Sequence, residues 1–150
     1  MKRLLAIGEA LIDFIPHQTG VAMKDVESFS PLVGGTTGET NPERALPKLF
    51  TGNVKLVVYT EGAEGARAYT KNARASAQGV KVTAVDTTGA GDGFVGAFLY
   101  QMYRDGVTAD SVDSLTEKRL EAYLDFSNRY CARSVMAKGG LPSYPTVHEM

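Results

Sequence analysis

The chain is 150 residues long, the length of one ordinary domain, and 43% of its residues are hydrophobic and 22% charged. This balance excludes a fibrous or a wholly disordered protein. The 16 lysines and arginines nearly match the 17 aspartates and glutamates, for a formal net charge of -1. Because basic side chains are not in excess and could not neutralise a phosphate backbone, we expect no nucleic-acid partner.

Cysteine and histidine usage indicates a reducing compartment and no metal cluster. Cys131 is the single cysteine, so no intrachain disulfide can form, and the two histidines, His17 and His148, are far apart in the sequence. The first apolar run stops at Glu9, short of a secretory signal, and no apolar stretch reaches the ~18 residues of a membrane helix. We therefore expect a cytoplasmic protein with no membrane partner.

Short strands and one short helix are expected in the first third of the chain. The apolar run Arg3–Ile7 is typical of a buried strand, and Ile12–Pro16 continues extended. Weak alternation predicts further short strands within residues 16–33. The segment Asn41–Glu43 supplies an N-cap, a first-turn proline and an acid, and so predicts a helix that Pro47 should kink or end.

The middle of the chain predicts a hairpin and a further strand. Val54–Tyr59 is the clearest strand of the sequence, and two glycines within Thr60–Gly65 break it. A hairpin into Ala66–Thr70 follows. Lys81–Val85 is expected to form another strand, which leads directly into a glycine-rich segment.

Two helices are expected in the last third. Apolar residues recur at helical spacing over 94–102, and Gly106 should stop this helix. A capping box at Ser114–Glu117 predicts the start of a long helix that ends before Gly139–Gly140. Strands that alternate with helices predict an α/β fold. The stripe of the long helix comprises Leu120, Tyr123, Leu124, Cys131 and Val135, and we interpret Tyr123, Tyr130 and Cys131 as packing residues.

The segment Gly89–Gly93 carries the clearest chemistry. It joins an expected strand to an expected helix, so that backbone N–H groups without side-chain cover lie at a helix N-terminus. Such a turn binds anions. The alternative is a glycine-rich turn in which Asp92 only complements the helix dipole. Taken alone, these residues do not decide between the two.

The spacing of Gly91–Gly96 also fits G-x-G-x-x-G, but the surroundings do not fit a dinucleotide site. Asp92 would point a carboxylate at the pyrophosphate, and no second strand supplies a ribose-binding acid. Asp92 fits better as a general base for a hydroxyl that accepts a phosphoryl group. The loop Gly89–Gly91 would then donate hydrogen bonds to the charge that spreads over the phosphoryl group.

The segment Asp86–Phe94 closely resembles the C-terminal signature of the PfkB, or ribokinase-like, carbohydrate kinases. Three further segments resemble this family in the same order along the chain. Gly8–Pro16 is similar to the start of bacterial fructokinases, Thr60–Gly65 to the nucleotide-binding turn, and Ser134–Ser143 to the segment that closes the adenine pocket. Alone, Asp13 could simply end a strand and Thr60–Gly65 could be a plain turn. The shared order of the four segments favours the kinase.

The resemblance implies a role for each matching residue. Asp92 would be the catalytic base, and Gly89, Ala90 and Gly91 would form the anion hole. The sugar would contact Asp13, Gly34 and Gly35, and the nucleotide Thr60, Gly62 and Gly65. A monovalent cation would be held by Asp86, Thr88, Ser134, Gly139 and Ser143. ATP and Mg²⁺ are implied, with K⁺ as the monovalent ion. The implied fold is a three-layer α/β/α domain with a small β lid, through which two copies could form a homodimer.

The chain also departs from the family. The two resembling parts meet at Gly35/Thr36, where a large internal segment of the family is missing. Residues 1–150 would thus form a single, incomplete ribokinase-like domain with lid strands at 16–33. The family's sugar-binding Asn after Gly34–Gly35 is absent, as is the N-x-x-E motif that supports Mg²⁺. The sequence leaves open whether this is a true deletion.

Two functions remain open. The first is an ATP-dependent sugar kinase, with fructose as the expected substrate, which the intact Asp92 loop favours. The second is a non-catalytic nucleotide-binding remnant, or truncated kinase fragment, which the missing motifs favour. We take the first as the identity of the protein, while the activity of this short chain stays open.

Overall fold

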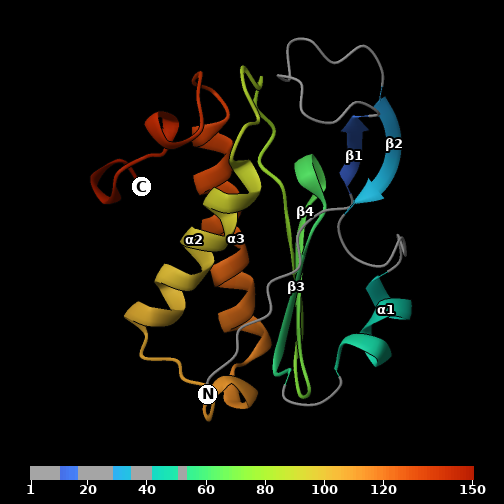
Figure 1. Cartoon of the computed structure of the whole chain (residues 1–150). Helices are drawn as coiled ribbons and strands as arrows, with labels where there is room; N and C mark the ends of the chain where they lie inside the picture. Colours follow the sequence, from blue (N-terminus) through green and yellow to red (C-terminus); the bar gives the residue numbers. More distant parts are fainter. Residues whose placement is uncertain (1–10, 17–28, 35–41, 51–53) are drawn as a thin grey trace.

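A three-stranded antiparallel sheet with helices on both faces forms the main body of the structure (Figure 1). The computed structural model describes residues 11–16, 29–34, 42–50 and 54–150. In chain order the strands and α-helices are β1 (Leu11–Pro16), β2 (Phe29–Gly34), α1 (Pro42–Leu49), β3 (Leu56–Thr60), β4 (Gly65–Thr70), β5 (Arg74–Gln78), α2 (Ala90–Arg104) and α3 (Glu117–Ser134). Short 3-10 turns occupy Gly62–Glu64, Val112–Ser114, Leu141–Ser143 and Val147–Glu149.

The sheet has the order β3-β4-β5, and both strand pairs run antiparallel. In its register Val58 pairs with Ala68, which pairs with Ala75. Because successive side chains of a strand point to opposite faces, Leu56 and Val58 join one hydrophobic cluster and Val57 joins another. The predicted hairpin from β3 into β4 is confirmed.

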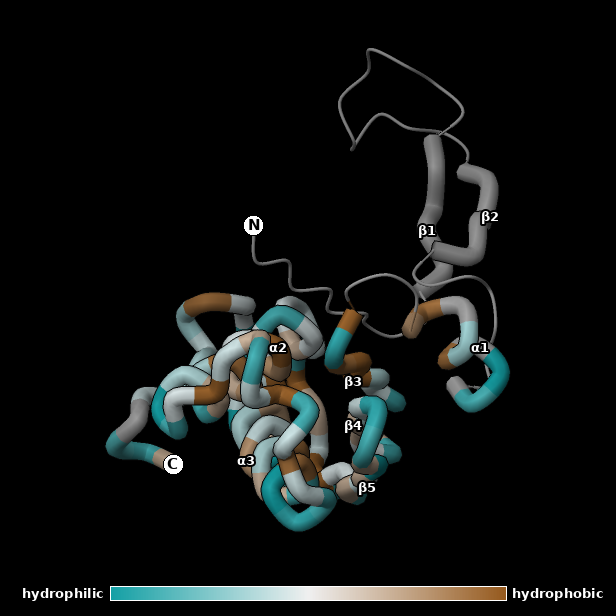
Figure 2. The backbone as a smooth tube through the Cα atoms, turned by 90° about the horizontal axis from the view of Figure 1, so that it is seen from below, coloured by the Kyte–Doolittle hydropathy of each residue, from teal (hydrophilic) through white to brown (hydrophobic). Residues whose placement is uncertain are grey.

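Helices cover each face of this sheet. On one face lie α2 and α3, where the rings of Phe98 and Tyr123 meet edge to face with centroids 5.6 Å apart and Leu120 is fully buried. On the other face lies α1, whose Leu46 packs with Val57. Figure 2 shows hydrophobic residues in the interior between α2, α3 and the strands. The expected three-layer α/β/α arrangement is therefore confirmed.

The strands β1 and β2 form a second antiparallel pair, in which Asp13 lies opposite Leu32. Both strands occupy segments where the sequence predicts extended structure. The predicted strand Arg3–Ile7 lies outside the described residues, as does the predicted N-cap Asn41.

The predicted strand at Lys81–Val85 is wrong. This segment pairs with none of the described strands, because β5 ends at Gln78 and a strand exists only where a neighbour completes its hydrogen-bond ladder. The N–H groups of Val85 and Asp86 instead donate to the carbonyl of Val135, at 2.7 and 3.2 Å. The third strand of the sheet is β5, which the sequence pattern does not predict, since its alternating alanines and polar residues have low β-propensity.

The helix α1 does not end at Pro47 but continues to Leu49, and a kink at this proline, the other expected effect, stays a prediction. The predicted N-terminal boundary of α3 is wrong. The N-cap of α3 is Thr116, whose side chain accepts a hydrogen bond from the N–H of Arg119 at 3.3 Å. Ser114 does not cap the helix, since its hydroxyl bonds within the preceding turn.

The helix α2 follows its predicted pattern. Phe94, Phe98 and Met102 are buried on one side, and Gly106, with a φ of +67°, follows the end of the helix. No helix in the described ranges combines the length and the apolar composition needed to cross a membrane.

Two glycines within α2 should respond differently to alanine. A Cβ at Gly96 would meet no atom within 4 Å, so Gly96→Ala should raise the free energy of unfolding by about 0.5–1 kcal/mol through helix propensity. A Cβ at Gly93 would lie 3.2 Å from the ring of Tyr144 and 3.3 Å from that of Tyr130. Gly93→Ala should therefore raise the free energy of unfolding by less than Gly96→Ala does. Equal stabilisation of both variants in urea unfolding would contradict this packing.

Candidate active site

The loop that leads into α2 is a tight turn built around Gly89. The N–H of Ala90 donates to the carbonyl of Thr87 at 3.1 Å, and the N–H of Gly93 donates to the carbonyl of Gly89 at 2.8 Å. Gly89 is the N-cap of α2 and has a φ of +75°, a left-handed conformation that side chains disfavour. The glycine at this position is therefore required by the backbone.

Gly91 has no such structural reason to be a glycine. It is exposed in the first turn of α2, and a Cβ there would meet no atom within 4 Å. The N–H groups of Gly91 and Asp92 lie in the turn where a helix offers no acceptor of its own, whereas the N–H of Ala90 is engaged within the loop. A bare backbone at Gly91 lets an anion approach these N–H groups closely.

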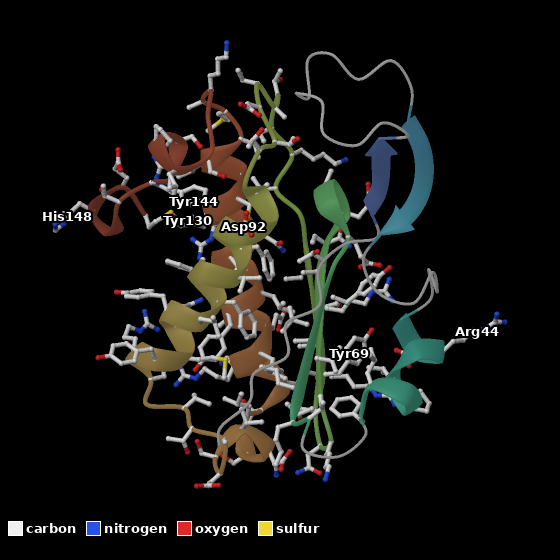
Figure 3. All side chains as sticks on the ribbon, viewed as in Figure 1. Arg44, Tyr69, Asp92, Tyr130, Tyr144 and His148 are labelled. Atoms are coloured by element: carbon white, nitrogen blue, oxygen red, sulfur yellow. The ribbon has the colours of Figure 1, made fainter. Side chains whose placement is uncertain are left out.

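Asp92 projects from the first turn of α2 and is exposed. Figure 3 places it beside Tyr130, which belongs to α3, and beside Tyr144, which follows the 3-10 turn Leu141–Ser143. Burial and the nearby charge of Asp92 raise the pKa of the Tyr144 hydroxyl, so this hydroxyl remains a donor at neutral pH. A carboxylate and anion-binding N–H groups thus share one helix turn.

A cavity of about 420 Å³ brings the glycine loop together with the hairpin turn between β3 and β4. Thr60, Gly62 and Gly65 line it from the hairpin, and Ala90 and Gly91 from the loop. Its volume lies within the range of small-molecule sites. Most of the remaining wall is apolar and comes from Val80, Val82, Ala84, Phe94, Ala132 and Val135.

Four polar residues of this cavity have no role in the sequence-based assignments: Lys81, Thr87, Asn128 and Cys131. The thiol of Cys131 donates to the carbonyl of Ala90 at 3.1 Å, and burial raises its pKa to about 12, so it stays protonated. The Asn128 amide donates to the carbonyls of Ala77 and Gln78 at 3.0 and 3.1 Å. One signal in the sequence could have indicated this part of the cavity wall: the polar residue Asn128 lies one turn before Cys131, on the core side of α3.

The residues expected to hold a monovalent cation surround the start of the same loop. Asp86 accepts the N–H of Thr88 on one carboxylate oxygen and the N–H of Gly139 on the other, both at 2.9 Å. The hydrogen bonds from Thr88, and then the one from Gly139, lower the pKa of Asp86. The hydroxyls of Ser134 and Ser143 each donate to a backbone carbonyl, those of Cys131 and Gly140.

The expected sugar contacts lie on the other strand pair. Asp13 is in β1 and Gly34 ends β2, opposite Leu11. The side chain of Asp13 and the whole of Gly35 lie outside what the structure describes. A sugar site shared by Asp13 and Asp92 therefore stays a prediction.

Free backbone N–H groups, a carboxylate and a cavity lie in one region of the structure, and comparison with known families assigns the class of the protein. Residues 35–147 match the pfkB family carbohydrate kinase, and the chain belongs to this family. It is similar to fructokinase-2 of Zea mays, with 43% identity over 112 residues, and to fructokinase-2 of Oryza sativa subsp. japonica, with 41% identity over 112 residues. Each match covers 75% of this chain and 32% of the relative, so the chain spans about a third of their length.

Solved structures agree in fold. The fructokinase of Xylella fastidiosa with bound ATP superposes with a TM-score of 0.67 at 23% identity, over 73% of this chain and 34% of that one. The fructokinase of Vibrio cholerae O395, in its fructose, ADP and calcium ion bound form, gives a TM-score of 0.60 at 31% identity, over 75% of this chain and 34% of that one. The fold is therefore that of ribokinase-like proteins.

The link between Asp86 and Gly139 should depend on pH in one direction. A carboxyl with a lowered pKa contributes stability above its ordinary value of 3.8 and loses it as the pH falls through the lower, folded-state value. We expect the amide proton shift of Gly139, followed by NMR, to be constant between about pH 5 and 8 and to titrate only below 3.8.

Asp86→Asn should remove this titration and shift the Gly139 resonance at neutral pH. Asp125→Asn, which removes a carboxylate paired with Arg129 on the surface of α3, is the control and should leave the resonance unchanged. A Gly139 titration that survives Asp86→Asn would contradict the hydrogen bond.

Proposed function

We propose that the protein phosphorylates a sugar hydroxyl with ATP, and that the sugar is fructose. The observation that carries this proposal is the position of Asp92 in the first turn of α2, directly after the loop Gly89–Gly91, of which Ala90 and Gly91 line the cavity. The similarity to fructokinases over three quarters of the chain supports fructose.

Asp92 acts as the general base in this proposal. The acceptor hydroxyl must lose its proton as it attacks the γ-phosphorus, and an exposed carboxylate within reach can take it. The bond to the leaving β-phosphate oxygen breaks, so negative charge spreads over the transferred group. The loop Gly89–Gly91 meets that charge with fixed backbone donors, of which the N–H of Gly91 is free of the loop's own hydrogen bonds.

ATP occupies the 420 Å³ cavity in this proposal. The apolar wall of α3 and residues 80–84 suits the adenine ring, while Thr60, Gly62 and Gly65 contact the nucleotide from the hairpin turn. Lys81, which also lines the cavity, suits the phosphate chain. Asp13, Gly34 and Gly35 are proposed to contact the sugar.

The residues around Asp86 fit a monovalent cation such as K⁺. Their oxygens are hard carboxylate, carbonyl and hydroxyl ligands, and each oxygen of Asp86 keeps a lone pair after accepting one N–H. Such an ion would be held by Asp86, Thr88, Ser134, Gly139 and Ser143. Its positive charge would offset the negative charge of a phosphate bound at the loop. Mg²⁺ is proposed to bind with ATP.

The second candidate function is a nucleotide-binding remnant that does not turn over. The observation that favours it is the absence of the family's sugar-binding Asn and of the N-x-x-E motif from this sequence. In either case we propose a cytoplasmic protein whose β1–β2 pair forms the contact of a homodimer.

ATP binding and fructose-dependent ATP consumption, measured on the wild-type chain, separate the two candidates, and the same measurements on Asp92→Asn test the general base. Asparagine keeps the size of the side chain and removes the base, so kcat should fall by at least ~10²-fold. ATP should still bind, with an unchanged or slightly lower Kd. Asp125→Asn is the control and should keep wild-type turnover. A wild-type chain that binds ATP but never turns over would be the remnant, and near-normal turnover of Asp92→Asn would exclude Asp92 as the base.

Gly91→Ala tests the anion hole without disturbing the fold. The added methyl meets no protein atom within 4 Å, so the free energy of unfolding should not fall. It does obstruct the approach of a phosphate to the N–H groups, so the Kd for ATP should rise by about tenfold, the value of one hydrogen bond to a charged group. The matched variant Gly96→Ala, five residues further along the same helix, should leave the Kd unchanged. Equal affinities for all three proteins would contradict the anion hole.

A further inference from the structure

We propose that Tyr144 is a positioning residue for the phosphate-binding loop: its hydroxyl fixes the Gly89 carbonyl and thereby the direction of the free N–H groups that follow it. This inference rests on the proposed function of the loop. Tyr144 touches neither nucleotide nor sugar in the proposed site, and acts through Gly89.

The hydrogen bond from the Tyr144 hydroxyl to the carbonyl of Gly89 is 2.6 Å long. The same carbonyl accepts the N–H of Gly93 at 2.8 Å, which closes the first turn of α2. A carbonyl oxygen has two lone pairs, so both donors are accommodated. Rotation of the Gly89–Ala90 peptide would break both bonds, and Gly89, which has no side chain, does little to oppose that rotation.

Tyr144 is itself held in place by the helices. Its ring lies against Tyr130 of α3, with centroids 5.8 Å apart, and both rings pack over Gly93, where a Cβ would come within 3.2 Å of Tyr144 (Figure 3). The N–H of Tyr144 donates to the carbonyl of Leu141 at 3.2 Å, in the turn that precedes it. The hydroxyl therefore approaches Gly89 from a ring fixed on two sides.

A second contact ties the same two segments together. Five residues before Tyr144, the N–H of Gly139 bonds Asp86, which lies three residues before Gly89. The segment from Asp86 to Gly89, which leads into the loop, is thus attached to the C-terminal segment at both of its ends. Asp86 fixes where the turn begins, and Tyr144 fixes the carbonyl at which α2 starts, so the N–H groups of Gly91 and Asp92 keep one direction before a phosphate arrives. Such preorganised donors need no rearrangement when charge develops.

Tyr144→Phe removes the hydroxyl and keeps the ring, and two measurements on the full 150-residue chain test its role. In the free protein, the hydrogen-exchange protection of the Gly93 amide, which shares the Gly89 carbonyl, should fall by about three- to tenfold, the effect of one hydrogen bond. In titrations, the Kd for ATP should rise by about three- to tenfold while the Kd for adenosine, which has no phosphate, stays unchanged. Tyr130→Phe is the matched control and should behave as wild type in both.

Several results would overturn the proposal. Wild-type Gly93 protection in Tyr144→Phe would show that the hydroxyl does not hold the loop. Equal weakening of ATP and adenosine binding would show that Tyr144 only attaches the C-terminal segment to the fold. If the wild-type chain binds no ATP, the proposed function fails, and the exchange measurement on Gly93 still decides whether Tyr144 positions the loop.

Discussion

The alanines on one face of the sheet set the position of the whole candidate site. Ala66 and Ala68 on β4 and Ala75 on β5 are buried beneath α2 and α3. Because these side chains are short, the large rings of Phe98 and Tyr123 can lie close against the strands. A bulkier residue here would overpack the core at a cost of about 1–3 kcal/mol and would lift both helices. The start of α2, and with it the glycine loop, depends on this close approach.

The cavity follows from a change of side-chain size along α3. The first half of the helix places Leu120, Tyr123 and Leu124 into the core, and these residues fill it completely. The second half places smaller groups on the same side, among them Asn128, Cys131 and Ala132. Large side chains fill the interior at the first half of α3, and the smaller side chains of the second half line the cavity instead. One end of the interface between α3 and the sheet is thus tightly packed, and the other end forms the cavity.

The parts of the fold that depend on local sequence could be predicted, and those that depend on distant partners could not. The stripe Phe94, Phe98 and Met102 and the glycine that follows α2 are local signals, and both are confirmed. Lys81–Val85 has the composition of a strand but no neighbour in the described chain to complete its ladder.

The candidate site divides in the same way. Gly89–Asp92 is contiguous and could be identified as one unit, and the turn Thr60–Gly65 could be identified by its resemblance to the family's nucleotide-binding turn. Asn128, Cys131 and Tyr144 reach the same region only through the packing of α3 and of the C-terminal segment. On their own helix or loop they are ordinary packing residues. No period or spacing in the sequence reveals that Cys131 and Tyr144 bond the backbone of the glycine loop, or that Asn128 bonds the carbonyls of Ala77 and Gln78 at the end of β5.

One helix turn must accommodate two negative charges if a phosphate binds beside Asp92. The dipole of α2 stabilises either anion, but it is shared between them, and two like charges a few ångströms apart repel. Lys81, which lines the cavity, and a cation held around Asp86 would each offset this repulsion. The repulsion also has a chemical consequence. It weakens as soon as Asp92 takes the proton of the acceptor hydroxyl, so the arrangement favours the state in which the proton has moved over the state before it, which is the requirement for a general base.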